Sequence, residues 1–429
     1  MSDDGAASSP SRRFSAEVAL TAVLAFAAIG VPLLVSQTGR DVFRIPKESL
    51  FEAASFFGAA LLGIIALYRG AEPFRRLWRE RRAALLVTIA AVVWTAIATA
   101  ASTNRELSAL SLLWVTSCAI VFLATLVASE RYERVLALVP IAPAIVNAII
   151  AMLQRSGTWN PLQFDANISL HFRTAGLIGT PNELGVYLLV PAIIAAAMAT
   201  TNGGRVRGAW LAALIVLLAG IVASESLSAL VAIAAAGTTL LLLSVKRAKR
   251  VFTILAVAAI VVGVAYSPFR ARAAQMLRDA RAGRYVEVTS YRLPAQLVAA
   301  RMFATHPLTG VGPGCFGFWY MPYKAQMNLD YPDFFALSEN FGEAHNDHLQ
   351  TLAVSGLPGY AIFIAAMFIL GRESLRQRRA GNRTLAASGA LPLVVGFAVV
   401  AIAQFPLSLA AVMGVTVNYA ALMISGAER

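Results

Sequence analysis

Long uninterrupted runs of apolar residues dominate the chain and restrict what it can fold into. A helix needs about 20 residues to cross about 30 Å of hydrocarbon. Twelve runs approach that length, and we expect a spanning helix at each of them: 15–36, 50–68, 83–101, 109–128, 135–153, 182–200, 208–223, 227–245, 251–266, 349–370, 385–403 and 409–427. The first run has no small-residue cleavage site, so we expect a retained helix rather than a removed signal peptide.

The composition agrees with a membrane protein. Hydrophobic residues make up 58% and charged residues 14% of the chain, whereas soluble domains have about 45–50% and about 25%. This excludes an ordinary soluble domain and predicts an all-α polytopic membrane protein with about twelve transmembrane helices. The two cysteines, Cys118 and Cys315, are too few for a disulfide scaffold, and we interpret both as structural.

The positive charges indicate how the chain is oriented. The chain has 36 Lys and Arg residues and 23 Asp and Glu residues. If the N-terminus lies in the cytoplasm, 22 of those 36 fall on the cytoplasmic side and only six in the short outer loops. The positive-inside rule then predicts that both termini are cytoplasmic. The net charge of +13 therefore reflects topology, and we expect no nucleic-acid partner.

One long connection, residues 267–344, separates the ninth span from the tenth. The predicted topology places it on the outer side, which is the periplasm in a bacterium. A loop of this length is rarely structureless, so we expect a small helical or mixed subdomain. Residues 267–301 hold seven arginines and two acidic residues, whereas residues 302–344 hold four acidic residues and one lysine. The chain thus divides into residues 1–266, 267–344 and 345–429.

The common nucleotide and zinc motifs are absent from the sequence. It contains no G-x-x-x-x-G-K-[ST] phosphate loop, no dinucleotide fingerprint and no H-E-x-x-H helix. A D-x-D pair for a metal-bound nucleotide sugar is also missing. The sequence therefore lacks the motifs typical of ATP-driven transporters and of metalloproteases. We expect no cofactor.

The run Glu343-Ala-His-Asn-Asp-His-Leu-Gln350 is the most informative segment, because it lies where the outer loop enters the tenth span. Asn346 or Asp347 could cap the new helix, and a helix N-terminus attracts anions. A neutral His345 there could act as a general base. The alternative is a capped helix start whose histidines anchor at the interface. A metal held by His345 and His348 would need Glu343 or Asp347 as a third ligand, and we expect none.

Two outer arginines are candidate anion ligands. Arg173 lies between the fifth and sixth spans, and Arg292 lies in the basic half of the long loop. The guanidinium fork matches two phosphate oxygens at once, although a lone arginine is more often a lipid or surface contact. Pro294 requires any helix near Arg292 to begin close by. Together with His345, the pair predicts an outward-facing site for a phosphate-bearing substrate.

These segments resemble the O-antigen ligase and polymerase superfamily. The resemblance is carried by His306-Pro-Leu-Thr-Gly-Val-Gly-Pro-Gly314 and by His345-Asn346 followed, after nine residues, by Gly356-x-x-Gly359. Arg173-Thr-Ala-Gly176 before Pro181-Asn182 resembles the outer loop ahead of the family's middle spans. Arg292, fifteen residues before Pro307, stands where the family's loop arginine is expected.

The resemblance implies a metal-independent, inverting glycosyltransferase in the bacterial inner membrane with a periplasmic active site. The donor would be a glycan on undecaprenyl pyrophosphate, and the acceptor a sugar hydroxyl of the lipid A core. Arg173 and Arg292 would hold the pyrophosphate, and His345 would deprotonate or orient the hydroxyl. Asn346 would cap the helix or hold sugar, while Glu343 and Asp347 would orient His345 or simply be solvated.

Three other functions remain open. An O-antigen polymerase shares the topology and motifs but uses a second lipid-linked glycan as acceptor. A protein O-oligosaccharyltransferase would modify Ser or Thr, but we see no additional outer domain that could grip a protein. A transporter or flippase should place ionisable residues at mid-membrane, whereas here they cluster at span ends. We therefore favour the ligase.

Overall fold

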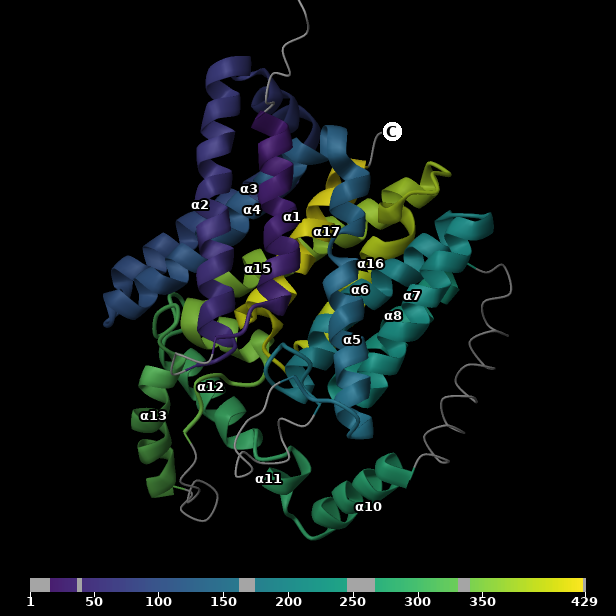
Figure 1. Ribbon diagram of the computed structural model, residues 1–429. Helices are drawn as coiled ribbons and strands as arrows, with labels where there is room; N and C mark the ends of the chain where they lie inside the picture. Colours follow the sequence, from purple (N-terminus) through teal and green to yellow (C-terminus); the bar gives the residue numbers. More distant parts are fainter. Residues whose placement is uncertain (1–15, 37–40, 162–173, 245–266, 331–339, 427–429) are drawn as a thin grey trace, which may run out of the picture.

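A computed structural model describes residues 16–36, 41–161, 174–244, 267–330 and 340–426. Every regular element in this described part is a helix (Figure 1). In chain order these are α1 (Ala16–Leu33), α2 (Arg44–Arg69), α3 (Glu72–Ala101), α4 (Arg105–Leu138), α5 (Ile141–Ser156), α6 (Pro181–Thr201), α7 (Gly204–Ala223), α8 (Leu227–Ser244), α10 (Ser267–Arg281), α11 (Tyr285–Val288), α12 (Leu293–Thr305), α13 (Phe316–Asp330), α15 (Asp347–Arg379), α16 (Leu385–Val400), the 3-10 turn η2 (Pro406–Ser408) and α17 (Ala410–Ser425).

The helices are those of a polytopic membrane protein. Eight segments of the described chain are long and apolar enough to cross a membrane, and α16 and α17 are shorter apolar helices. One of the eight, Arg105–Ser156, joins two of the expected spans. The span expected at 135–153 comprises the last turn of α4 and most of α5, which meet at Pro140. The expected span at 251–266 lies outside the described residues, so the count of twelve stays a prediction.

Helix α6 forms the centre of the bundle and is buried along most of its length. It packs against α7, α8 and α16. Small residues allow this close packing: a Cβ added at Gly185 would lie 2.6 Å from the Ser226 Cβ, and one at Gly220 in α7 would lie 2.9 Å from the Leu188 Cδ1. Helices that meet through small residues approach closely, as is typical within membranes.

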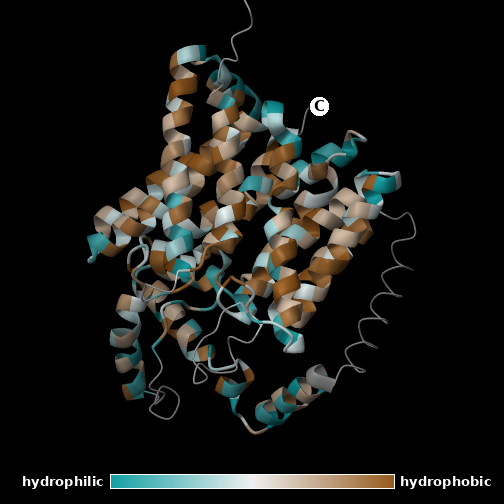
Figure 2. Cartoon of the chain, viewed as in Figure 1, coloured by the Kyte–Doolittle hydropathy of each residue, from teal (hydrophilic) through white to brown (hydrophobic). Residues whose placement is uncertain are grey.

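The two ends of the described chain lie at the same end of the bundle (Figure 1). Arg81 in α3 donates a hydrogen bond from Nη2 to the Ser425 carbonyl at the end of α17, at 3.0 Å. Helices α10–α13 gather at the opposite end (Figure 1). The bundle is mainly hydrophobic, whereas α10 carries many hydrophilic residues (Figure 2). Within its described part, the connection 267–344 is helical, as expected, and the three-part division of the chain stays a prediction.

Candidate active site

Two side chains fix the start of α15. Asn346 has an extended backbone, and its Oδ1 accepts a hydrogen bond from the Leu349 amide at 3.1 Å. Asn346 therefore forms a helix cap. Asp347 is 1% exposed, and its Oδ2 accepts from the Leu407 amide at 2.8 Å while its own amide donates to the Ala401 carbonyl at 2.8 Å. Asp347 thus ties α15 to the α16–α17 connection and is not solvated at the surface.

His345, just before this cap, has a backbone conformation that side chains rarely adopt. Its φ is +51°, in the left-handed region. The ring packs edge-on between Phe341 and Phe405, with centroid distances of 5.7 and 4.9 Å. Its Nδ1 is buried and has no hydrogen-bond partner in the described part of the chain. Backbone strain and an unpaired buried nitrogen concentrate at functional sites.

The surroundings keep the His345 imidazole neutral. Burial lowers the pKa of His345 to about 4, and the positive charge of Arg292 acts in the same direction. At neutral pH the ring is therefore deprotonated and can accept a proton or a hydrogen bond. A base with so low a pKa is weak. An anion bound near Arg292 would raise the pKa again.

Arg292 immediately precedes α12, which has Pro294 in its first turn, so the predicted helix start is confirmed. The Arg292 Nη1 donates a hydrogen bond to the Ala403 carbonyl at 3.1 Å. Burial lowers the pKa of Arg292, and repulsion from Arg272 adds to the effect. The Ala403 bond is the one hydrogen bond described for the guanidinium, which has five N–H donors. Most of these donors have no partner among the described residues and could bind a ligand.

The connection between α16 and α17, residues 401–409, brings these groups together. The Ala403 carbonyl accepts from Arg292, and the Phe405 ring contacts His345. The Leu407 amide binds Asp347, and the Leu407 carbonyl accepts from the Trp114 Nε1 at 3.0 Å. Sequence reasoning treated this segment only as the end of one apolar run and the start of another. Pro406, which cannot continue a helix, was the local signal for a structured turn.

Arg44 is a further site residue that sequence reasoning missed. It begins α2, and its Nη1 lies 2.6 Å from Glu343 Oε1 while its Nε lies 3.1 Å from Glu48 Oε1. The guanidinium carbon also lies 5.7 Å from the centre of the Phe405 ring. Glu343, considered above as a partner of His345, thus pairs with Arg44. An arginine and a glutamate four residues apart at the start of an apolar span were the available signal.

The glycine-rich motif docks against a break in α15. Gly356 has a φ of +66°, and a Cβ there would lie 2.0 Å from the Leu308 carbonyl oxygen. The Leu357 amide donates to the Pro307 carbonyl at 2.8 Å, and the Val311 amide donates to the Ala353 carbonyl at 2.9 Å. The two halves of the sequence signature, His306–Gly314 and Gly356–Gly359, are therefore brought together by this contact.

The remaining predicted residues are placed as follows. His348 turns away from His345: its Nε2 lies 3.1 Å from the Ala398 carbonyl oxygen and its Nδ1 lies 3.3 Å from the Tyr360 hydroxyl. Within the described ranges, no three His, Cys, Asp or Glu side chains are grouped to hold a metal. Arg173 lies outside the described residues. The chain just after it is held by the Gln154 Oε1, which accepts from the Gly176 amide at 2.8 Å.

The fold and the site together define a class: polytopic α-helical membrane proteins with a histidine and arginines at one end of the helix bundle. Residues 212–364 match a protein-family model described as O-antigen ligase. The matched segment includes Arg292, the glycine-rich motif and His345. No curated protein matches the chain.

Proposed function

We propose that the protein is an O-antigen ligase. It transfers a glycan from undecaprenyl pyrophosphate to a sugar hydroxyl of the lipid A core, at the periplasmic face of a bacterial inner membrane. The observation that carries this proposal is the meeting of His345 and Arg292 on residues 401–409. An unpaired imidazole nitrogen beside a cationic group suits a reaction that removes a proton and releases an anion.

The proposed reaction is a direct displacement with inversion. The acceptor hydroxyl oxygen attacks the anomeric carbon, the bond from that carbon to the pyrophosphate breaks, and His345 accepts the hydroxyl proton. Arg292 and Arg173 stabilise the pyrophosphate as negative charge develops on it, so the step needs no divalent metal. Bound pyrophosphate offsets the Arg292 charge that lowers the His345 pKa. The base therefore becomes stronger when the donor arrives.

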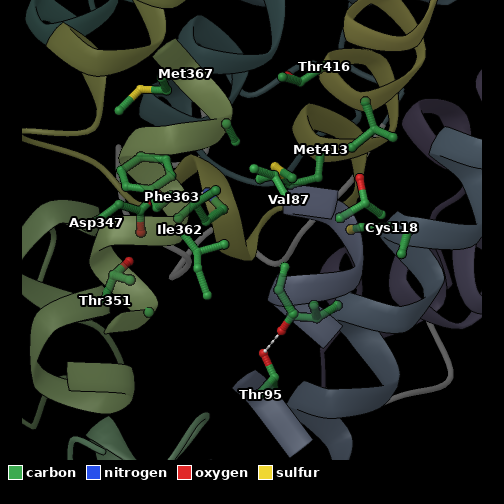
Figure 3. A pocket seen from close by; sticks show the side chains of 18 of the residues that line it. Val87, Thr95, Cys118, Asp347, Thr351, Ile362, Phe363, Met367, Met413 and Thr416 are labelled. Carbon is green, nitrogen blue, oxygen red and sulfur yellow. Dashed lines mark hydrogen bonds between the residues drawn. The ribbon is translucent and has the colours of Figure 1, made fainter. Parts of the chain in front are cut away.

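An apolar cavity supports a lipid-linked donor. It has a volume of about 470 Å³, lies among α3, α4, α15, α16 and α17, and is lined mainly by apolar side chains such as Val87, Ile362 and Met413 (Figure 3). Asp347 and Thr351, at the start of α15, also line it (Figure 3). A polyprenyl tail could lie in this cavity while the pyrophosphate reaches the site.

Reconstitution tests the proposal directly. Purified protein is mixed with glycan on undecaprenyl pyrophosphate and with lipid A core, in detergent and in the presence of a metal chelator. We expect glycan attached to the core, seen as a mass increase of the acceptor. Longer glycans on the lipid carrier would instead indicate a polymerase. A lack of any transfer, with lipid-linked glycan crossing the bilayer of vesicles, would indicate a transporter.

The variant His345→Ala should reduce transfer about 10²- to 10⁴-fold, the usual contribution of a general base. His306→Gln is a matched control, because the His306 side chain is exposed and its described hydrogen bonds are to the Thr305 and Tyr323 hydroxyls. We expect this control to retain most activity. Equal rates for His345→Ala and the unaltered protein would exclude His345 from the chemistry.

A further inference from the structure

A second cavity lies between α15 and α16, far from His345. Its volume is about 650 Å³. One part of its lining is basic and consists of Arg372, Arg376 and Arg379. The other part is apolar and consists of Ile364, Met367, Phe368, Gly371, Leu375, Leu391 and Val394. Phe368 is 68% exposed although it lies in a candidate membrane span, so its ring faces the surroundings of the bundle.

The length of α15 places this cavity at the opposite membrane surface. Arg372 follows the break at Gly356 by 16 residues, which corresponds to roughly 24 Å of helix, and the helix before the break adds about two turns from Asp347. The hydrocarbon core is about 30 Å thick, or about 40–45 Å with its headgroup layers. If the start of α15 lies at one interface, Arg372 reaches the headgroup layer of the other leaflet. Phe368, one turn earlier, remains within the acyl chains.

Two of the three arginines have no ion-pair partner within the described part of the chain and can bind an anion. Arg376 pairs with Glu373, with 3.0 Å between Nε and Oε2. Arg372 and Arg379 are both exposed, and no ion pair of either is described. They are seven residues apart, so they lie on one face of the helix, about 10 Å apart along its axis.

We propose that this cavity binds an anionic phospholipid of the leaflet opposite the candidate active site. The phosphate lies between Arg372 and Arg379, and an acyl chain follows Ile364 and Phe368. Basic pockets between helices near the headgroup layer bind such lipids. Topology alone would place arginines at this end, but it would not require them to line an apolar cavity. Arg383, in the connection to α16, is exposed and lines no part of this cavity.

Native mass spectrometry of the full-length protein tests the site. The delipidated protein is titrated with phosphatidylglycerol and with phosphatidylcholine of the same acyl chains. At about one kcal/mol for each arginine, we expect phosphatidylglycerol to bind roughly 10- to 30-fold more tightly. Arg372→Gln/Arg379→Gln should remove this preference. Arg134→Gln/Arg383→Gln, which removes the same charge from exposed residues outside the cavity, should keep it.

Two results would overturn the proposal: equal affinity for both lipids in the unaltered protein, or an equal loss of preference in both double variants. Val394→Phe keeps the test valid if the arginine variant does not fold. The larger side chain fills the apolar half of the cavity and should weaken the binding of both lipids. Unchanged lipid binding by a folded Val394→Phe protein would also overturn the proposal. None of these readouts depends on glycan transfer, so the result is independent of the proposed function.

Discussion

At the scale of the residue, the neighbours of His345 hold it in its strained conformation. The Ala344 amide donates to the Gln350 Oε1 at 2.6 Å, and the Asp347 amide donates to the Ala401 carbonyl at 2.8 Å. The chain is thus anchored on both sides of a residue with a positive φ. Conformations of this kind cost of order 1–3 kcal/mol and persist only when their surroundings enforce them. The backbone at His345 is therefore held from both sides, and the ring is held by Phe341 and Phe405.

The lowered pKa of His345 predicts a distinctive pH dependence. In the free protein the ring is protonated only near pH 4, so the acid limb of kcat/KM for the donor should fall there and not at 6.5. Bound pyrophosphate raises the pKa, so the acid limb of kcat should lie at higher pH. Initial rates from about pH 3 to 8 measure both limbs. Limbs with the same midpoint would contradict the donor-induced shift of the His345 pKa.

The same pKa shift affects folding. Between about pH 6.5 and 4 the unfolded chain binds a proton at His345 that the folded chain does not. Stability contributed by this residue is therefore present above pH 6.5 and is lost as the pH falls toward 4. Size-exclusion profiles at each pH separate this loss of folded protein from the kinetic effect.

The Arg44–Glu343 ion pair should position His345. Arg44→Gln and Glu343→Gln should each lower kcat about tenfold, and the double variant should be little worse than either, with a coupling energy of about 1 kcal/mol or more. Arg155→Gln is the matched control, since it breaks the Arg155–Glu225 pair of 2.5 Å. A positioning role would be contradicted if the losses of kcat were additive in the double variant. It would also be contradicted if the variants were unfolded and the folded fraction kept its normal kcat.

At the scale of the element, the break in α15 depends on one glycine. Gly356→Ala places a Cβ against the Leu308 carbonyl oxygen in a backbone conformation suited to glycine, and should destabilise the protein by about 3 kcal/mol. Gly237→Ala is the control, because nothing lies within 4 Å of a Cβ in that helix. It should be neutral or stabilising by up to about 1 kcal/mol. Thermal unfolding of both variants measures the difference, and similar melting temperatures would contradict the proposed packing.

Apolar runs were enough to predict most of the bundle, because length and hydropathy are local properties. They did not reveal the division at Pro140 or the break at Gly356, which interrupt helices without changing their apolar character. His345 and Arg292 were candidates from the sequence because each lies in a recognisable segment, and their roles stay a prediction. The contact of Arg292 with Ala403 joins residues 111 positions apart, and that of Arg44 with Ser408 joins residues 364 apart. Local patterns carry no information on such pairs.

At the scale of the whole molecule, the ends of the described chain share one end of the bundle, and α10–α13 occupy the other (Figure 1). This arrangement agrees with the even number of crossings that the charge distribution predicts. Which end faces the cytoplasm stays a prediction.

Cysteine labelling tests that prediction. Leu329 in α13 is 85% exposed, and Arg383 is exposed near the other end of the bundle. In intact spheroplasts, a membrane-impermeant maleimide should label Leu329→Cys and leave Arg383→Cys unlabelled until the membrane is permeabilised. The unaltered protein measures background from Cys118 and Cys315. Labelling of Arg383→Cys in intact spheroplasts would reverse the orientation.

The backbone that receives Arg292 and His345 belongs to residues 401–409, beyond the segment that matches the O-antigen ligase model. Arg44, near the beginning of the described chain, completes the same cluster. The matched segment therefore does not contain the whole cluster. Hybrids that exchange only residues 212–364 between relatives should insert into membranes yet lose glycan transfer, because the exchanged segment would meet unfamiliar partners at residues 401–409 and at Arg44.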